Sequence, residues 1–366
     1  MAKTFVALFV GIAVALLFAE IILRFARPLK VYEPHRPVGD FSCYQEGTYY
    51  WSRLRPNATC TLHSNVGDFS DITIKTNSLG LRDKEIQATK SEGIKRILFI
   101  GDSFTFGWGV QEDQSYPRLT EQILQKNGLP VEVINAGRPS NSPAGYYLYL
   151  INEGLKFDPD IVVVGFDIFN DLSNSAYNEV WSEKDAKELP TKVIYSSYYV
   201  DSQGRLREKN IPLKFAVPIL KHSRLFGLLT DVFLPPQQSF ANNEQRVQEE
   251  VIARVKNLFK EMNDILNGRD KKLMIVIIPM NIEVDEDVRL ASGLPRFTSG
   301  INPLIMEFSS HFSKNDIEYI NLLPRFVQNR ERNSLYYKQD AHLTVTGQKF
   351  AAELISERLL PHLEAK

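Results

Sequence analysis

Apolar residues recur along this chain in short continuous runs separated by amphipathic stretches. Continuous runs are typical of strands buried on both faces, and they occupy residues 96–100, 131–134, 161–165, 273–279 and 318–322. Helical periodicity occupies residues 115–127, 144–156, 243–268 and 344–360. Strands and helices that alternate in this way predict an α/β fold with a three-layer, doubly wound, flavodoxin-like sheet of mainly parallel strands.

Two segments interrupt this alternation. Residues 31–90 follow a proline-containing linker and include a strand pattern at 71–75, so we predict a β-rich lead-in there. Residues 172–243 form an insertion into a domain that otherwise spans 91–366, with a hairpin turn predicted at 201–204. Its aromatic residues either form a wall for an acyl or sugar group or pack only against one another within the insertion. They are Tyr177, Trp181, Tyr195, Tyr198 and Tyr199.

The N-terminal segment, residues 1–30, has a different pattern. Thr4 to Ala19 is an uncharged run of 16 residues, and apolar residues continue past Glu20 to Leu23. Twenty helical residues reach about 30 Å, the thickness of a bilayer core, and a glutamate near the end can snorkel. A cleaved signal peptide is the alternative, although Leu17-Phe18-Ala19 is a poor cleavage site. We therefore expect a single-pass membrane anchor.

Two features bear on which side of the membrane carries the large domain. Arg24, Arg27 and Lys30 follow the apolar run, and the positive-inside rule then favours the cytoplasm. Cys43 and Cys60 are separated by 16 residues in the lead-in. They are either one disulfide formed in an oxidising compartment or two unrelated buried thiols. On the cysteines we expect an extracytoplasmic domain.

Composition narrows the classes of function. The 366 residues are 43% hydrophobic and 24% charged, with a formal net charge of −1. A net charge this small provides no overall electrostatic attraction to nucleic acid. The sequence also has no zinc-like spacing of cysteine and histidine and no phosphate-binding glycine pattern. We therefore expect no nucleic-acid partner, metal or cofactor, and a nucleotide-binding α/β protein is poorly supported.

Candidate chemistry begins where the first apolar run ends. That run stops at Gly101-Asp102-Ser103, where glycine allows a sharp turn that leaves Ser103 at the carboxyl edge of the strand. Open α/β sheets bind ligands at this edge. Ser103 can act there as a nucleophile whose own N–H helps hold an oxyanion, or it can be part of a helix cap.

Three further segments follow in a definite order, each next to a predicted strand or helix. They are Val131–Gly137, Ile161–Asp171 and Asp340–Gly347. Together with the Gly-Asp-Ser corner, they resemble the four sequence blocks of the SGNH, or GDSL-type, esterase and acyltransferase family over roughly residues 70–360. The resemblance implies the SGNH-hydrolase fold.

By this resemblance Ser103 is the nucleophile, His342 is the general base, and the N–H groups of Ser103 and Gly137 form an oxyanion hole with the side-chain amide of Asn170. Chemistry supports these residue types, because a serine hydroxyl is a poor nucleophile until an imidazole takes its proton. The tetrahedral intermediate also needs donors already aimed at its oxygen. Taken alone, Gly137 is equally a turn glycine and Asn170 a strand-end cap.

The last block departs from the family pattern. The usual spacing is Asp-x-x-His, whereas Asp340-Ala341-His342 is one residue shorter. A turn lets Asp340 reach the ring of His342, and a regular helix does not. Asp340 is therefore either the acid of a triad or a cap for the helix that follows.

We expect a membrane-anchored serine esterase or O-acyltransferase that forms an acyl-enzyme on Ser103. Its partner is an ester-bearing substrate such as an acylated small molecule, a glycan or a lipid. The two activities differ in whether water or an alcohol receives the acyl group. A non-catalytic SGNH scaffold that binds an envelope glycan or partner is the alternative, which the spacing of Asp340 and His342 leaves open.

Overall fold

The computed structural model describes the chain in segments: residues 14–22, 41–64, 67–87, 89–195, 198–200, 206–208, 245–291 and 302–364, with Thr4, Leu8 and Gly11. Two compact units divide the chain, residues 1–37 with 209–244 and residues 38–208 with 245–366. Most of the predicted anchor, and the insertion beyond residue 208, lie outside the described residues. Within the described residues, no helix has both the length and the apolar content that crossing a bilayer requires.

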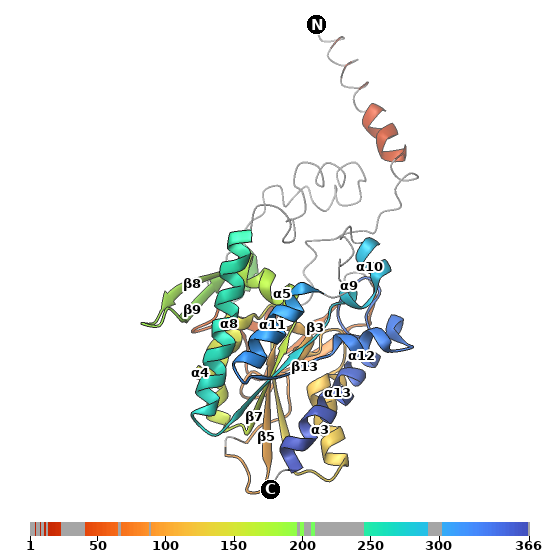
Figure 1. Cartoon of the computed structure of the whole chain (residues 1–366). Helices are drawn as coiled ribbons and strands as arrows, with labels where there is room; N and C mark the ends of the chain where they lie inside the picture. Colours follow the sequence, from red (N-terminus) through yellow and green to blue (C-terminus); the bar gives the residue numbers. More distant parts are fainter. Residues whose placement is uncertain are drawn as a thin grey trace. The chain divides into compact units, whose positions relative to one another are not determined.

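A five-stranded sheet forms the centre of the second unit (Figure 1). Its strands, in spatial order, are β13 (Glu318–Asn321), β12 (Lys272–Ile277), β7 (Ile161–Phe166), β5 (Lys95–Gly101) and β6 (Val131–Gly137). Every neighbouring pair is parallel. The central strands are buried on both faces, as the continuous apolar runs predict. The predicted parallel α/β sheet is confirmed.

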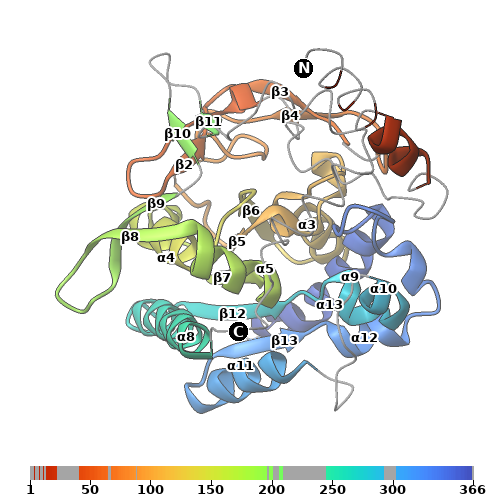
Figure 2. The ribbon, with the colours of Figure 1, turned by 90° about the horizontal axis from the view of Figure 1, so that it is seen from above.

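Helices cover both faces of this sheet and complete three layers (Figure 2). One face carries α3 (Tyr116–Lys126) and α13 (Val345–Glu364), and the other carries α4 (Pro143–Asn152), α8 (Gln245–Asn267) and α11 (Pro303–Lys314). Phe166 at the end of β7 makes edge contacts with Phe259 of α8 and Phe308 of α11, which fixes these two helices on the same face.

Short helices lie in the connections between these elements. Those in the described residues are η1 (Phe41–Cys43), α2 (Ser103–Phe106), η2 (Glu112–Gln114), η3 (Gly154–Phe157), α5 (Ile168–Ser173), η4 (Asn174–Asn178), α9 (Asn281–Val284), α10 (Glu286–Ala291), α12 (Leu323–Gln328) and η5 (Arg332–Ser334).

Two small antiparallel sheets precede the central one. One pairs β1 (Tyr44–Glu46) with β2 (Ser52–Leu54), and the other pairs β3 (Thr59–Leu62) with β4 (Ile72–Lys75). Cys43 and Cys60 form a disulfide between η1 and β3. The inward side chains of these strands form an apolar cluster with Phe106 of α2, so this segment packs on the helix that begins at Ser103.

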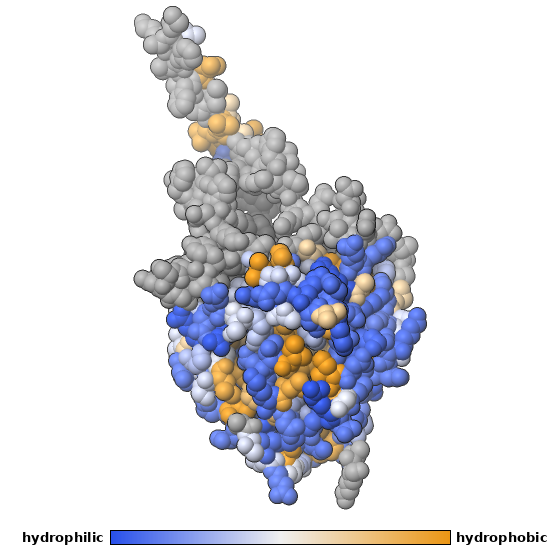
Figure 3. Space-filling model, turned by 90° about the vertical axis from the view of Figure 1, so that its left-hand side faces the viewer, coloured by the Kyte–Doolittle hydropathy of each residue, from blue (hydrophilic) through white to orange (hydrophobic). Residues whose placement is uncertain are grey.

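The described part of the insertion contains two hairpins, β8 (Glu179–Lys184) with β9 (Pro190–Tyr195) and β10 (Tyr198–Val200) with β11 (Leu206–Glu208). The predicted turn at 201–204 lies outside the described residues. Tyr195 stacks on Trp51, with ring centroids 4.5 Å apart. Figure 3 shows the side of the molecule that carries β8, β9 and α8, where hydrophilic surface surrounds hydrophobic patches.

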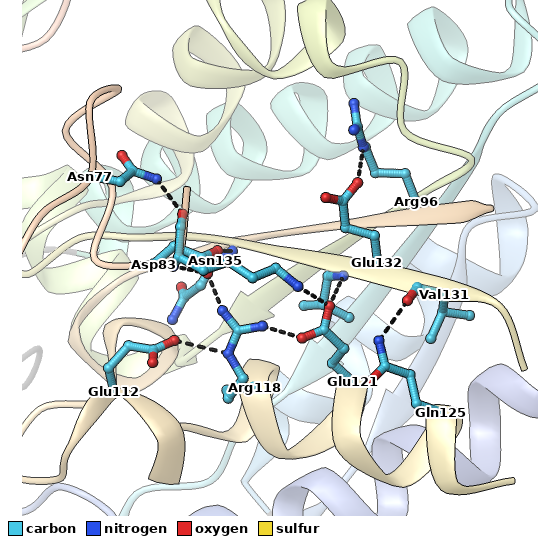
Figure 4. Close-up of polar contacts among 12 residues, drawn as sticks. Asn77, Asp83, Arg96, Glu112, Arg118, Glu121, Gln125, Val131, Glu132 and Asn135 are labelled. Atoms are coloured by element: carbon cyan, nitrogen blue, oxygen red, sulfur yellow. Dashed lines mark hydrogen bonds and ion pairs between the residues drawn. The ribbon is translucent and has the colours of Figure 1, made fainter. Parts of the chain in front are cut away.

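An ion network centred on the buried Arg118, Asp83 and Glu121 joins the segment before β5 to α3 (Figure 4). Arg118 of α3 forms ion pairs with Asp83, Glu121 and Glu112, the last at 2.9 Å between Nε and Oε1. Lys84 adds a contact of 2.5 Å to Glu121. Asp83 also accepts a hydrogen bond of 2.7 Å from the backbone N–H of Asn135 in β6. The network therefore ties three parts of the fold together through charges of both signs.

Candidate active site

The Gly-Asp-Ser corner joins β5 to α2. Asp102 is the N-cap of α2, and its side chain accepts a hydrogen bond of 2.9 Å from the N–H of Phe104. Ser103 is the first helical residue. A Cβ at Gly101 would lie 1.9 Å from the Thr105 hydroxyl, so glycine is required for α2 to turn back this closely on the strand. Because Asp102 provides the cap, the Ser103 hydroxyl is available for another partner.

That partner is His342. Its Nε2 lies 2.7 Å from the Ser103 Oγ, and its Nδ1 is hydrogen-bonded to Asp340 Oδ1. The loop before α13 turns tightly here, because the backbone N–H of His342 also reaches Asp340 Oδ1, at 3.1 Å. Although only one residue separates them, Asp340 and His342 thus pair as two members of a triad would. The structure brings the three predicted residues together.

The loop that carries Asp340, called the acid loop from here on, is held by residues far away in the sequence. Asp68, in the connection between β3 and β4, accepts hydrogen bonds of 2.7 Å from the backbone N–H groups of Gln339 and Asp340. The Trp108 indole N–H approaches Asp340 Oδ2 at 3.3 Å. Burial alone would raise the pKa of Asp340, but its hydrogen bonds with His342 and Trp108 and the charge of His342 hold that pKa below its ordinary value. Asp340 is therefore kept ionised.

Asn170 lies near the start of α5, just beyond β7. Its side-chain amide donates a hydrogen bond of 2.6 Å to Asp102 Oδ2. A primary amide carries two hydrogens, so one can hold the side chain in place while the other is offered to a ligand. Asp167 caps α5 by accepting from the N–H groups of Phe169 and Asn170, at 3.1 and 3.3 Å. The corner and the end of β7 are thereby joined.

Gly137 has a different environment from the other predicted site residues. Its N–H donates a hydrogen bond of 2.9 Å to the Asn135 side chain. A Cβ at this position would lie 2.3 Å from the backbone nitrogen of Phe106, so close packing of β6 on α2 accounts for the glycine. Ser140, three residues further on, lines the cavity beside Ser103 and has a left-handed backbone with φ of 57°. Nothing in the sequence pattern identified Ser140.

Three buried carboxyl groups lie beneath the serine. Asp102, Asp167 and Asp171 are at most 1% exposed. Burial raises the pKa of each, and the charge of Asp102 raises those of Asp167 and Asp171 further. Tyr146 donates a hydrogen bond of 2.6 Å to Asp171. Perturbed carboxyl groups of this kind are typical of functional sites.

A cavity of about 420 Å³ opens onto these residues. Its polar lining includes Ser103, His342, Asp340 and Asn170. Most of its apolar lining comes from the lead-in segment and from residues shortly after the serine: Tyr44, Trp51, Leu54, Leu62, Ile74, Phe104, Phe106 and Trp108. Pro139, Met280 and Ala341 also contribute to it. Within the segments described above, no three His, Cys, Asp or Glu side chains are grouped to hold a metal ion.

Comparison with known proteins gives the family. Residues 99–350 match the GDSL-like Lipase/Acylhydrolase family. The match covers more than half of the chain and includes Ser103, Asn170 and His342, so the chain belongs to this family. It is an α/β protein of the GDSL esterase and acylhydrolase type, as the four sequence blocks predict. No curated protein matches the chain.

Solved structures of this fold are distant from the chain. A lipase/acylhydrolase from Enterococcus faecalis is 17% identical, and the likeness covers 74% of this chain and 98% of that one, with a TM-score of 0.43. The acetyl xylan esterase AlAXEase is 16% identical over 72% and 99%, with a TM-score of 0.39. The esterase EstA from Pseudoalteromonas sp. is 9% identical over 74% and 100%, with a TM-score of 0.40.

Proposed function

We propose that this protein is a serine ester hydrolase or acyltransferase that works through an acyl-enzyme on Ser103. The observation that carries the proposal is the continuous hydrogen-bond chain from Asp340 through His342 to the Ser103 hydroxyl. Such a chain activates a serine because the imidazole can accept its proton as the oxygen attacks.

In the first half of the reaction, Ser103 Oγ attacks the ester carbonyl and His342 Nε2 takes the hydroxyl proton. The tetrahedral oxyanion is held by the Ser103 N–H and by the second hydrogen of the Asn170 amide. Gly137 would first have to exchange its bond with Asn135 to contribute. When the intermediate collapses, His342 gives its proton to the departing alkoxide and leaves an acyl group on Ser103.

In the second half, water or an acceptor alcohol attacks the acyl group while His342 again takes a proton. The oxyanion forms and collapses a second time, and the proton returns to Ser103. Asp340 holds the ring so that Nε2 faces the serine, and it stabilises the imidazolium that forms in both halves. Hydrolysis and transfer to an alcohol therefore share one acyl-enzyme.

The proposal also places the enzyme on a membrane, anchored through residues 1–30 with the catalytic domain outside the cytoplasm. The run from Thr4 to Leu23 supports the anchor by its length and composition. The Cys43–Cys60 disulfide supports an oxidising compartment. The full-length protein should resist extraction by alkaline carbonate, and a chain lacking residues 1–30 should be released; extraction of both would contradict the anchor.

The test of the catalytic proposal is Ser103→Ala, which removes the nucleophile and one buried oxygen. Hydrolysis of p-nitrophenyl esters should fall by about 10⁶-fold in kcat with the melting temperature almost unchanged. Activity within tenfold of the parent enzyme would exclude Ser103 as the nucleophile and favour a non-catalytic scaffold.

A further inference from the structure

Part of the apolar lining of the cavity, called the wall from here on, comes from residues that precede the family match. Leu54 of β2, Leu62 of β3 and Ile74 of β4 line it, and each is only 4–6% exposed. The matched region begins at residue 99. The chemistry of this wall is therefore a property of this chain's own lead-in segment.

The wall continues to the nucleophile. Phe106 packs in the same apolar cluster as these three residues, and it follows Ser103 by three positions in α2. Residues three apart in a helix lie on the same face, so the wall begins beside the serine that would carry the acyl group.

The wall is also fixed in place. The Cys43–Cys60 disulfide lies inside the cluster and links η1 to β3. Arg82, 1% exposed, donates hydrogen bonds to the carbonyls of Phe106 and Gly107 at 3.0 and 2.7 Å. A surface that is rigid and almost fully buried binds a chain without first having to order itself.

We infer that the cavity binds an unbranched, medium-length acyl chain on this wall, and that the enzyme prefers such esters to acetyl esters. The volume of 420 Å³ equals the share of about fourteen water molecules. An acetyl group fills only a small part of it and leaves the wall uncovered. We assign the chain to the acyl part of the ester because the wall continues to Phe106 in the same short helix as Ser103, and the acyl group is bonded to Ser103 in the intermediate. The inference rests on the proposed function for its ester bond.

Each methylene that leaves water for this wall should raise kcat/KM by up to about fourfold, which corresponds to ~0.8 kcal/mol. The p-nitrophenyl esters of acetic, butyric and octanoic acid should therefore rise in kcat/KM in that order, with about 10²-fold between butyrate and octanoate. Octyl acetate should gain no such advantage over ethyl acetate. A flat acyl series, or a gain only along the alcohol series, would contradict the inference.

Thr61→Trp tests the location. Thr61 of β3 is half-buried and lines the cavity, so an indole there occupies space that the chain needs. The variant should reduce the octanoate-to-acetate ratio of kcat/KM by about 30-fold. Thr59→Trp is the matched control, on an exposed position of the same strand, and should keep the parent ratio. An unchanged ratio in Thr61→Trp would place the chain elsewhere.

Binding to Ser103→Ala separates this inference from the catalytic proposal, because it needs no reaction. By titration calorimetry the variant should bind octanamide at least about tenfold more tightly than butanamide, and the added Thr61→Trp change should abolish the difference. This result would support the wall even if Ser103 proved inert. Equal affinity for the two amides would overturn the acyl pocket whether or not the enzyme hydrolyses esters.

Discussion

Two groups of carboxyl side chains, most of them buried, differ in how their charge is balanced. The carboxylates of Asp83, Glu121 and Glu112 form ion pairs with Arg118 (Figure 4). Glu121 also forms an ion pair with Lys84. Burial raises the pKa of Asp83 to about 6, although Arg118 favours its charged form. Removing the cation there would leave several negative groups without compensation.

Beneath Ser103, the hydrogen-bond partners of the carboxyl groups are neutral. Asp102 accepts from the Phe104 N–H and the Asn170 amide, and Asp171 accepts from the Tyr146 hydroxyl. Groups held by neutral donors keep raised pKa values, and they can position other polar groups without introducing a competing cation. We therefore expect the group around Arg118 to stabilise the fold and the group beneath Ser103 to position the groups of the active site.

After Ser103→Ala, the largest loss of activity should come from Asp340→Asn, which changes the acid beside His342 and belongs to neither group of carboxyl side chains. The amide cannot stabilise the imidazolium of His342 and favours the wrong tautomer, so kcat should fall by about 10⁴-fold. Steady-state kinetics on a p-nitrophenyl ester measures this, with the melting temperature as a control for folding. Near-normal activity would assign Asp340 to the local turn alone.

Arg118→Ala should give the reverse result. Loss of the cation from the Asp83 and Glu121 pairs should lower the free energy of unfolding by about 3–5 kcal/mol. The kcat of the folded fraction should stay within about threefold of the parent. Urea denaturation measures the first quantity, and Lys260→Ala, which breaks an exposed helical pair with Asp264, is the control expected to change little. A stable Arg118→Ala protein would contradict the structural role.

Asn170→Ala should lower kcat by about 10²- to 10³-fold with a smaller change in KM, because the amide acts mainly on the transition state. The same change removes the donor to Asp102. If KM alone increased, Asn170 would bind the ground state and the assignment to the oxyanion hole would be wrong.

Asp167→Asn should have the smallest effect of these substitutions. The effect should be seen in how the stability of the folded protein depends on pH. The pKa of folded Asp167 lies well above 3.8, so the folded state holds a proton that the unfolded chain releases above that value. The contribution of Asp167 to the free energy of unfolding is therefore complete below about pH 3.8 and is lost as pH rises through the pKa of the folded state. Asparagine should flatten this loss in melting curves taken between about pH 4 and pH 9. An unchanged slope would contradict the raised pKa.

The sheet could be predicted because buried parallel strands are continuous apolar runs. The run at 131–134 extends in the structure to Gly137, since polar and small residues also belong to that strand, and the run at 161–165 extends by one apolar residue to Phe166. The site residues could be predicted from their residue types and from the order of the four sequence blocks. The catalytic roles of Ser103 and His342 stay predictions.

Contacts between residues that are distant in the sequence could not be predicted. The hydrogen bond from the Asp340 N–H to Asp68 joins positions 272 residues apart, and no local pattern marks Asp68 as a support for the acid loop. The resemblance to the family predicts Gly137 as an oxyanion-hole donor, but a sequence does not reveal that the Asn135 side chain already accepts its N–H. Which donors are engaged depends on packing between strands.

The most direct test of the central claim is labelling of the purified protein with a fluorophosphonate, followed by mass spectrometry of its peptides. The reagent reacts with a serine whose proton is taken by a nearby base, and the chain from Asp340 through His342 to Ser103 should provide this. We expect one adduct per chain, on the peptide that contains Ser103, and none in His342→Ala. Absence of an adduct, or an adduct on another serine, would contradict the account.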